Sequence, residues 1–414
     1  MPYSSVGDLL QRERTGTHHL ASATRQSRAF DLQVSVEKSV ESVHKGGVTW
    51  LDLDGIEHRW LLAAAADASV AAYDIQARRI QTTRVVGRQK ALQSSTEHVA
   101  AFKLDRSNPD NHKYTTTCAC WYPIDTGMFV TGSFDQEIKV WDTNSLTAVC
   151  NFGLPDRVFA LDMSQVAAVH CLIAVGSAEP QVKLCDLASG AFTHTLVGHG
   201  GAVWALHWSL TSEWHLFTSA ADGQVRMWDI RTSGCIHVFD QHDTHAGSSS
   251  KQSRGQQEEG IVGQSRPAQH RQAHEGAVTA VVPTPDGLYL LTAGTDSRIR
   301  LWDLQDNSNT LVNYPSPFNR SKKGRQVAVS SDAPLVFHPS GSVIQAFHLH
   351  EGSLQRLLRG HIDTVNACCY NPVTQEVLTG SNDCQIMVWS PPGDDIQDAH
   401  DTWSDGFESP GVSD

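Results

Sequence analysis

Residues 198–229 read GHGGAVWALHWSLTSEWHLFTSAADGQVRMWD. This stretch opens on a Gly-His pair, continues through two apolar strand-like runs, turns at Asp222 and closes on Trp228-Asp229. Further copies of the same order occupy 274–303, 360–390 and a stretch that passes through 132–135 and ends at Trp141-Asp142. Self-similarity over a few tens of residues indicates one small structural unit that the chain uses repeatedly.

The repeated unit has the signature of the WD40 repeat, in which each copy supplies one four-stranded blade of a β-propeller. Two weaker copies lie at 44–74 and 157–186, where Tyr73 and Cys185 replace Trp and Glu179 stands near the expected turn Asp. Between Trp302-Asp303 and His361 there is room for one more unit, with alternating apolar residues at 327–329 and 343–347. The sequence therefore predicts an all-β fold, a seven-bladed WD40 β-propeller over residues 31–392.

The recurring polar residues are predicted to be architectural. Within a good blade the His, a strand hydroxyl, the turn Asp and the Trp can join one buried hydrogen-bond chain, for example His199, Ser219, Asp222 and Trp228. A His beside a Ser and an Asp also resembles a catalytic triad. Because the trio returns with every good blade, whereas an enzyme needs one site at one pocket, no catalytic residue is assigned.

The composition of the chain argues against several classes of function. The chain of 414 residues has a formal net charge of −13, which disfavours non-specific binding to nucleic acid. Its nine cysteines lie mostly in apolar strand-like runs, as expected of buried free thiols, and no pair has zinc-knuckle spacing, so no metal or cofactor is predicted. No signal sequence and no run of about 20 apolar residues is present, so we expect no membrane association.

Three segments break the repeat. Residues 1–30 are predicted to form a helix-loop-helix that docks on a partner, and an alternating run from Phe30 to Val36 is expected to pair with the last blade and close the ring. Residues 241–272 are predicted to be a disordered insertion and 393–414 a disordered acidic tail. Residues 77–111 must hold the outer strand of the first blade together with an extended loop.

Five runs of sequence carry a resemblance beyond the generic repeat. They are WYPIDTGMF at 121–129, KVWDTN at 139–144, VKLCDL at 182–187, TLVNY at 310–314 and SKKG at 321–324. On these runs, from about residue 14 to the tail, the chain resembles the Cockayne syndrome group A family of DNA excision repair WD-repeat proteins. It departs from that family in the 241–272 insertion and in the first helix.

The resemblance implies a non-catalytic substrate receptor of a cullin-RING ubiquitin ligase, acting in transcription-coupled nucleotide excision repair in the nucleus. It implies that the helices and one propeller face dock on the large damaged-DNA-binding adaptor protein. Residues 221–231, ADGQVRMWDIR, match the Asp-Trp-Asp box of adaptor-binding propellers, in which Arg231 can make bidentate contacts. The residues predicted to bind the adaptor are Leu9, Leu10, Leu20, Arg25, Arg28, Trp228, Asp229 and Arg231.

The opposite face, formed by the Asp turns and the loops before each first strand, is predicted to hold the target. Candidate contacts there are Phe134, Arg157, Glu179, Thr295, Arg325 and Asn382. The resemblance implies the Cockayne syndrome group B remodelling ATPase as partner and ubiquitylation target, with the stalled RNA polymerase II complex nearby. A receptor of this kind would act by proximity, because it holds a target beside a charged ubiquitin carrier.

Three alternatives remain open at this point. A generic WD40 scaffold of another nuclear complex explains the repeats but leaves the N-terminal helices and Arg231 without a role. An enzyme would need one irregular polar cluster on the propeller axis. A direct reader of damaged DNA would need a basic face with interleaved aromatics, and the only compact basic group is at 321–325.

Overall fold

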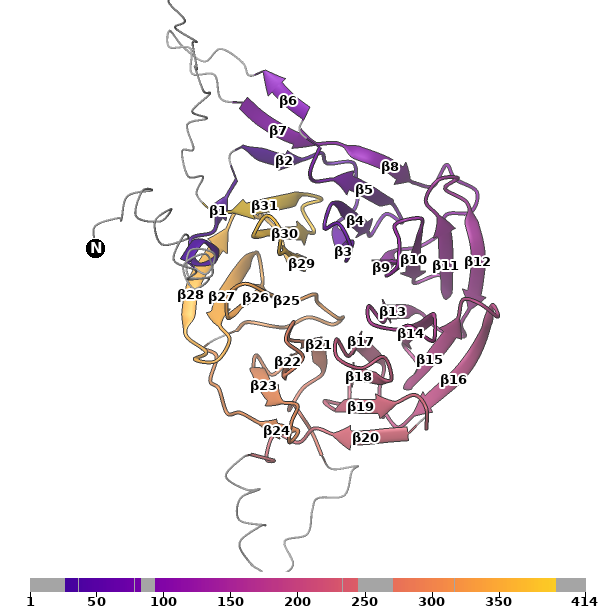
Figure 1. The fold of residues 1–414 in the computed structure, drawn as a ribbon, viewed down its shortest axis with the longest axis vertical. Coiled ribbons are helices and arrows are strands. Elements are labelled where there is room, and N and C mark those ends of the chain that lie inside the picture. Colours follow the sequence, from indigo (N-terminus) through magenta and orange to yellow (C-terminus); the bar gives the residue numbers. More distant parts are fainter. Residues whose placement is uncertain are drawn as a thin grey trace, which may run out of the picture.

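The computed structural model is a closed ring of seven four-stranded antiparallel sheets, and Figure 1 views this ring along its axis. The structure describes residues 27–35, 37–77, 79–82, 94–232, 234–244, 271–315 and 317–391. The seven-bladed propeller predicted from the repeats is therefore confirmed, including the sixth blade, which lacks the repeat signature.

The strands of each blade are numbered in chain order and run from the axis outward. Blades 1 and 2 comprise β3 (Val48–Leu53), β4 (Trp60–Ala65), β5 (Val70–Asp74), β8 (Ala100–Leu104), β9 (Thr116–Trp121), β10 (Met128–Ser133), β11 (Glu137–Asp142) and β12 (Ala148–Gly153). Blades 3 and 4 comprise β13 (Val158–Met163), β14 (Leu172–Ser177), β15 (Gln181–Asp186), β16 (Ala191–Val197), β17 (Val203–Trp208), β18 (His215–Ala220), β19 (Val225–Asp229) and β20 (Gly234–Val238).

The second half of the chain repeats this arrangement. Blades 5 and 6 comprise β21 (Val278–Pro283), β22 (Tyr289–Gly294), β23 (Ile299–Asp303), β24 (Ser308–Asn309), β25 (Ala328–Val329), β26 (Leu335–Ser340), β27 (Val343–His348) and β28 (Leu354–Arg359). Blade 7 comprises β29 (Val365–Asn371), β30 (Glu376–Ser381), β31 (Ile386–Ser390) and, as its outer strand, β1 (Gln33–Val34).

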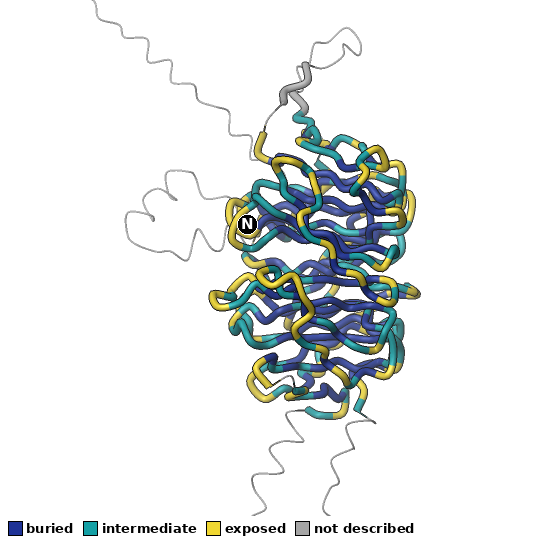
Figure 2. The backbone as a smooth tube through the Cα atoms, turned by 90° about the vertical axis from the view of Figure 1, so that its right-hand side faces the viewer, coloured by how far each residue is buried: buried dark blue, intermediate teal, exposed yellow. Residues whose placement is uncertain are grey.

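The core lies between neighbouring blades, where the faces of adjacent sheets pack on each other. The second strand of each blade is almost wholly buried, whereas outermost strands such as β16 and β28 are largely exposed. Figure 2 shows this edge-on, with buried strands inside and exposed loops on the two faces. All nine cysteines are free, and those in the inner strands are buried or half-buried, as the sequence predicts. A single blade would leave both of its faces in water, so only the closed ring buries them.

The two chain ends close the ring, as predicted. In the strand β1, Gln33 pairs with Ser390 and Val34 pairs with Trp389 of β31. The strand is shorter than the alternation suggests, because residues 27–30 are helical and Val36 lies outside the described residues. Ala29 and Leu32 are buried against blade 6, so this helical segment is fixed to the side of the propeller.

A further small sheet lies outside blade 1. It consists of β2 (Lys38–Val40), β7 (Ser94–His98) and β6 (Arg79–Thr82), with β2 parallel to β7. The predicted outer strand of blade 1 within 77–111 is β8, and part of the remaining insertion forms β6 and β7 (Figure 1).

Several predictions fall outside the described residues. They concern the first helix and most of the second in 1–26, the greater part of the insertion at 245–270, and the tail from 392 onward. The described ends of the insertion form a neck, in which the Gln241 amide N–H donates to the Gln272 carbonyl. Within the described part of the chain, no helix has the length and apolar character that crossing a membrane requires.

Candidate functional site

Four blades contain the predicted buried polar chain, always with a threonine at its centre. In blade 4 the His199 Nε2 and the Trp228 Nε1 both lie 2.7 Å from the Thr218 hydroxyl, and the Asp222 carboxylate lies 3.4 Å from His199 Nδ1. The prediction of Ser219 in this chain is wrong. Side chains alternate along a strand, so Ser219 points to the other face, where its hydroxyl donates to the Ala205 carbonyl.

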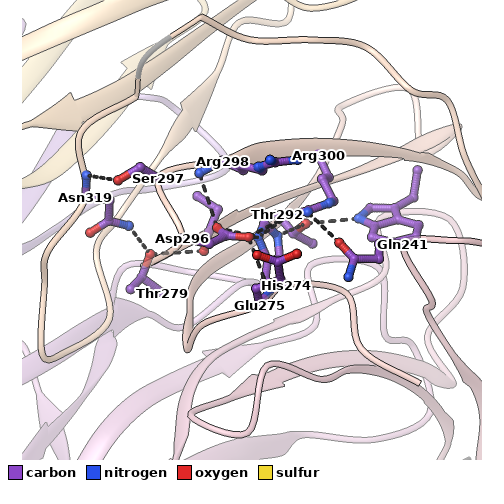
Figure 3. A network of polar contacts seen from close by, with 12 residues as sticks. Gln241, His274, Glu275, Thr279, Thr292, Asp296, Ser297, Arg298, Arg300 and Asn319 are labelled. Carbon is purple, nitrogen blue, oxygen red and sulfur yellow. Dashed lines mark hydrogen bonds and ion pairs between the residues drawn. The ribbon is translucent and has the colours of Figure 1, made fainter. Parts of the chain in front are cut away.

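Blade 5 has an additional cation in the same chain (Figure 3). The Arg300 guanidinium lies 2.7 Å from His274 Nδ1 and 2.9 Å from Asp296, and it also donates to the Gln241 side chain. His274 Nδ1 also lies 3.0 Å and 3.2 Å from the two Asp296 carboxylate oxygens, and its Nε2 lies 2.8 Å from the Thr292 hydroxyl. These groups satisfy one another within the blade, so the recurring trio is architecture at each of its four occurrences.

The strands divide the surface of the ring into two faces. One side, which we call the Arg231 face, is formed by two loops of each blade: the loop between its first and second strands and the loop between its third and fourth strands. The other side, which we call the Asp-turn face, is formed by the turns between the second and third strands and by the loops that lead into each first strand. Arg231 and the six residues predicted to contact the target fall on these two opposite faces.

On the Arg231 face, Arg231 is held in a defined geometry. Its guanidinium makes two bonds to the Asp229 carboxylate, Nε to Oδ1 at 3.0 Å and Nη2 to Oδ2 at 2.6 Å, and lies 5.8 Å from the Trp214 ring centroid. The Arg231 side chain is nonetheless 56 % exposed. Two contacts within the chain thus orient an accessible cation toward solvent.

Trp228 cannot touch a partner directly, and its prediction as an adaptor contact is wrong. Its side chain is 1 % exposed and its indole N–H donates to Thr218. A Trp at this position fills the space between blades, which removes it from every surface. Asp229 is mostly covered and acts through Arg231.

The loops around Arg231 present exposed aliphatic side chains that the repeat pattern did not reveal. Five of the seven loops between first and second strands have one or two of them. These residues are Ile56, Ile124, Val166, Val169, Leu288 and Val373. Loops on the same face line a cavity of about 370 Å³, whose walls include Pro123, Val166, Leu210 and Pro285. Exposed apolar groups around a hollow are typical of a surface that a partner covers.

Two carboxyl groups line the inner part of this cavity. Asp52 accepts the Trp121 amide N–H at 2.7 Å and Asp162 accepts that of Trp208 at 2.8 Å, so each bonds to the next blade. Burial raises the pKa of Asp52 to about 8, and it also raises the pKa of Asp162. His207 lies 3.4 Å from Asp162. Near neutral pH, Asp52 is therefore largely protonated.

Replacing Asp52 by asparagine should stabilise the protein at high pH more than at low pH. The folded state keeps the Asp52 proton between about pH 4 and pH 8, whereas the unfolded chain has lost it, so unfolding becomes easier as the pH rises through this window. An asparagine side chain does not titrate. We expect the advantage of Asp52→Asn to grow by about 1–3 kcal/mol between pH 5 and pH 8, less than the full shift because the carboxyl borders a cavity. Chemical denaturation of both proteins at pH 5 and pH 8 measures this difference in unfolding free energy. Parallel pH profiles of stability for the variant and the wild type would contradict the prediction.

The predicted target contacts lie on the Asp-turn face, and the structure brings two of them together. The Arg157 guanidinium is exposed and lies 5.8 Å from the Phe134 ring centroid, and Phe134 makes an edge contact with Phe159. Glu179 pairs with Lys183 at 3.1 Å, and the Asn382 side chain accepts a bond from Asn366. Thr295 is half-buried in its turn, and Arg325 is half-buried, donating to the Pro339 carbonyl at 3.4 Å.

Of the N-terminal residues predicted to bind the adaptor, the structure describes one. Arg28 is exposed within the helical residues 27–30, beside a groove of about 390 Å³ that Lys38, Glu376 and Pro391 also line. Leu9, Leu10, Leu20 and Arg25 lie outside the described residues.

The fold and the two surfaces define a WD40 β-propeller protein, and the comparisons with known proteins agree. The family model described as WD domain, G-beta repeat matches 106–142, 190–229, 265–303 and 352–390, the four regions that end in the four complete polar chains. The chain is 39 % identical to the WD repeat-containing protein ATCSA-1 of Arabidopsis thaliana, over 95 % of this chain and 98 % of that protein. This chain belongs to the family of that protein.

More distant relatives share the repeats over shorter stretches. Radiation-sensitive protein 28 of Saccharomyces cerevisiae is 24 % identical over 46 % of this chain and 38 % of its own length. Nuclear distribution protein nudF of Aspergillus niger is 23 % identical over 68 % of this chain and 60 % of its own length.

Proposed function

We propose that this chain is the substrate-recognition subunit of a cullin-RING ubiquitin ligase that acts in transcription-coupled nucleotide excision repair. The resemblance to the Cockayne syndrome group A family supports this proposal, as does membership of the family of ATCSA-1. A relative named for radiation sensitivity is consistent with a role in DNA repair. The subunit would work in the nucleus and supply no catalytic residue of its own.

The observation that carries the proposal is the composition of the Arg231 face. An oriented, accessible arginine stands among exposed aliphatic side chains, and a large adaptor protein could cover both at once. Apolar contacts would supply affinity, whereas a guanidinium with donors to spare would fix the register. The buried Ala29 holds residues 27–30 against the side of the same propeller, and under the proposal the chain before residue 27 acts as the second docking element.

The Asp-turn face would then remain free for targets. Under the proposal these are the Cockayne syndrome group B remodelling ATPase and the stalled RNA polymerase II complex around it. Holding the ATPase beside a charged ubiquitin carrier raises its local concentration, which needs geometry and no chemistry on this chain.

Removal of residues 1–26 together with Arg231→Glu should abolish association with the damaged-DNA-binding adaptor. The deletion stops at 26 because Ala29 and Leu32 belong to the propeller core, so the ring stays intact. Co-purification of the two proteins, with Arg106→Glu as an exposed control outside this face, measures the loss. Unchanged adaptor binding would overturn the proposal and favour a scaffold of another nuclear complex.

A further inference from the structure

The inner strands of six blades share a β-bulge at one position near the Asp-turn face. In each case the register shifts across a single residue of the first strand. The bulged residues are Thr49, Thr117, Phe159, Trp204, Thr279 and Asn366. Equivalent positions in a repeat protein are expected to have the same structural role, so a different kind of side chain at one of them needs an explanation.

Four of these residues are polar and tie strands or blades together. The Thr49 hydroxyl donates to the Thr116 carbonyl of the next blade at 2.6 Å, and Thr117 donates to Val158 at 3.0 Å. Thr279 donates to Ala293 within its own blade at 3.0 Å, and Asn366 donates to Val48 of the next blade at 2.8 Å. The bulge thus normally carries a hydrogen bond that stabilises the ring.

Blades 3 and 4 lack this hydrogen bond, because the bulged residue in each of them is aromatic. Phe159 has no polar group, and the half-buried Trp204 makes no side-chain hydrogen bond within the part of the chain that the structure describes. The rings stand on adjacent inner strands, and Phe134 and Arg157 extend the cluster outward. At the mouth of the channel, two hydrogen bonds that would stabilise the ring are thus replaced by an aromatic surface. This exchange indicates that the surface binds a partner.

The basic segment at 321–325 runs past Trp204, one of these two aromatic residues. Gly324 approaches the backbone of Trp204 so closely that a Cβ there would clash with the Trp204 carbonyl oxygen, so only glycine fits. The segment is held firmly: the Arg325 amide donates to Thr279, and the Gln326 side chain donates to the Leu51 carbonyl of blade 1 at 2.6 Å. The backbone that carries the cations Lys322, Lys323 and Arg325 is therefore fixed beside Trp204, and the Arg325 guanidinium reaches the Pro339 carbonyl of blade 6.

These cations lack carboxylate partners. Among the described residues, no ion pair involves the side chains of Arg157, Lys322, Lys323 or Arg325. Burial and the neighbouring Arg325 lower the pKa of Lys323, so the two cations disfavour each other. The nearby carboxylates are engaged: Glu179 with Lys183, Asp135 with His112, and Asp156 with the Arg157 amide. In a chain of net charge −13, this is a local positive region around apolar rings.

We infer that the channel mouth at blades 3 and 4, comprising Phe134, Arg157, Phe159, Trp204 and the segment 322–325, binds an extended acidic segment of a target protein that carries an apolar or aromatic side chain. Its carboxylates would pair with the flanking cations while its apolar side chain covers the rings. The inference rests on the proposed function for assigning this face to targets. Duplex DNA fits less well, because the cations gather at one narrow mouth instead of following a line of phosphates.

The test is peptide binding to the full chain without any adaptor. The probe is a fluorescein-labelled peptide in which Asp and Glu alternate with Leu around one Trp; its partner probe has Lys in place of every acid. We expect the acidic probe alone to bind. Phe159→Thr with Trp204→Thr should weaken its affinity at least about tenfold. Threonine is the residue that three other blades have at this position, so the ring should tolerate it. Arg157→Glu should have a similar effect, whereas Arg298→Glu, an exposed arginine on the same face in blade 5, should not.

Equal binding of the two probes, or affinity unaffected by these variants, would overturn the inference. Tighter binding of a short DNA duplex that the same variants abolish would replace it with a nucleic-acid site. Co-purification with the adaptor depends on the opposite face and is measured separately. A variant that still binds the adaptor but not the peptide supports both proposals, and failure of either measurement alone identifies which of them is wrong.

Discussion

Ile124→Asp combined with Val169→Asp should abolish binding of the damaged-DNA-binding adaptor while leaving the propeller folded. Both side chains lie in loops of the Arg231 face and are 61 % and 73 % exposed, so aspartate costs the isolated chain almost nothing. In a complex the two carboxylates would be buried without partners, which costs several kcal/mol in total. We expect adaptor affinity to fall at least about a hundredfold, as measured by surface plasmon resonance or co-purification.

The matched control is Ile362→Asp. Ile362 is 91 % exposed, more than either loop residue, but it lies on the Asp-turn face in the loop before β29. The same substitution there should leave adaptor binding intact. If the control weakens binding as much as the paired variant, exposed aliphatic residues in general cause the effect, and the assignment of the Arg231 face is wrong.

Thr292→Val should destabilise the protein by about 2–4 kcal/mol. The Thr292 hydroxyl lies 2.8 Å from His274 Nε2 and accepts from Trp302 Nε1 at 2.9 Å, and all three groups are buried (Figure 3). His274 Nδ1 already faces Arg300 and Asp296, so the imidazole depends on Thr292 for a partner at Nε2. Valine has nearly the same shape, and the loss reflects two buried nitrogens, Trp302 Nε1 and His274 Nε2, left without a hydrogen-bond partner.

Urea denaturation of the full chain measures this effect, with Thr295→Val as control. Thr295 is in the same blade and is only half-buried, and its hydroxyl takes no part in the polar chain, so its removal should change stability by less than about 0.5 kcal/mol. Blade 3 already has Val175 at the position of Thr292, with Cys185 where blade 5 has Trp302, so a valine fits the site sterically. Equal stability of Thr292→Val and wild type would mean that the polar chain contributes little.

The repeat pattern determined most of the fold before any coordinates. The His, Asp and Trp-Asp spacing predicted the number of blades and the pairing of the chain ends, because a blade that cannot bury its faces alone requires a closed ring. It did not determine which hydroxyl joins the polar chain. Ser219 and Thr218 are neighbours in sequence but point to opposite faces of the strand, and only the register of β18 against its neighbours decides between them.

The two candidate surfaces depended much more on the tertiary structure. The repeat identified Arg231 and the Asp turns, but it also suggested Trp228 as a contact, although packing between blades buries that side chain. Ile124, Val169 and the other loop aliphatics lie in separate repeats without a shared motif, and only closure of the ring gathers them on one face. The bulged residues Phe159 and Trp204 read in sequence as ordinary apolar strand residues.

The sequence alone therefore determined the architecture of this protein, since a repeated pattern of burial and hydrogen bonding is local to each blade and can be seen one unit at a time. The tertiary structure decided which side chains share a surface. Residues such as Arg157, Trp204 and Gly324 come from separate blades and a long connecting segment, and nothing in their sequence spacing places them together. Only the closure of the ring brings them to one end of the channel, where their charge and apolar surface act jointly.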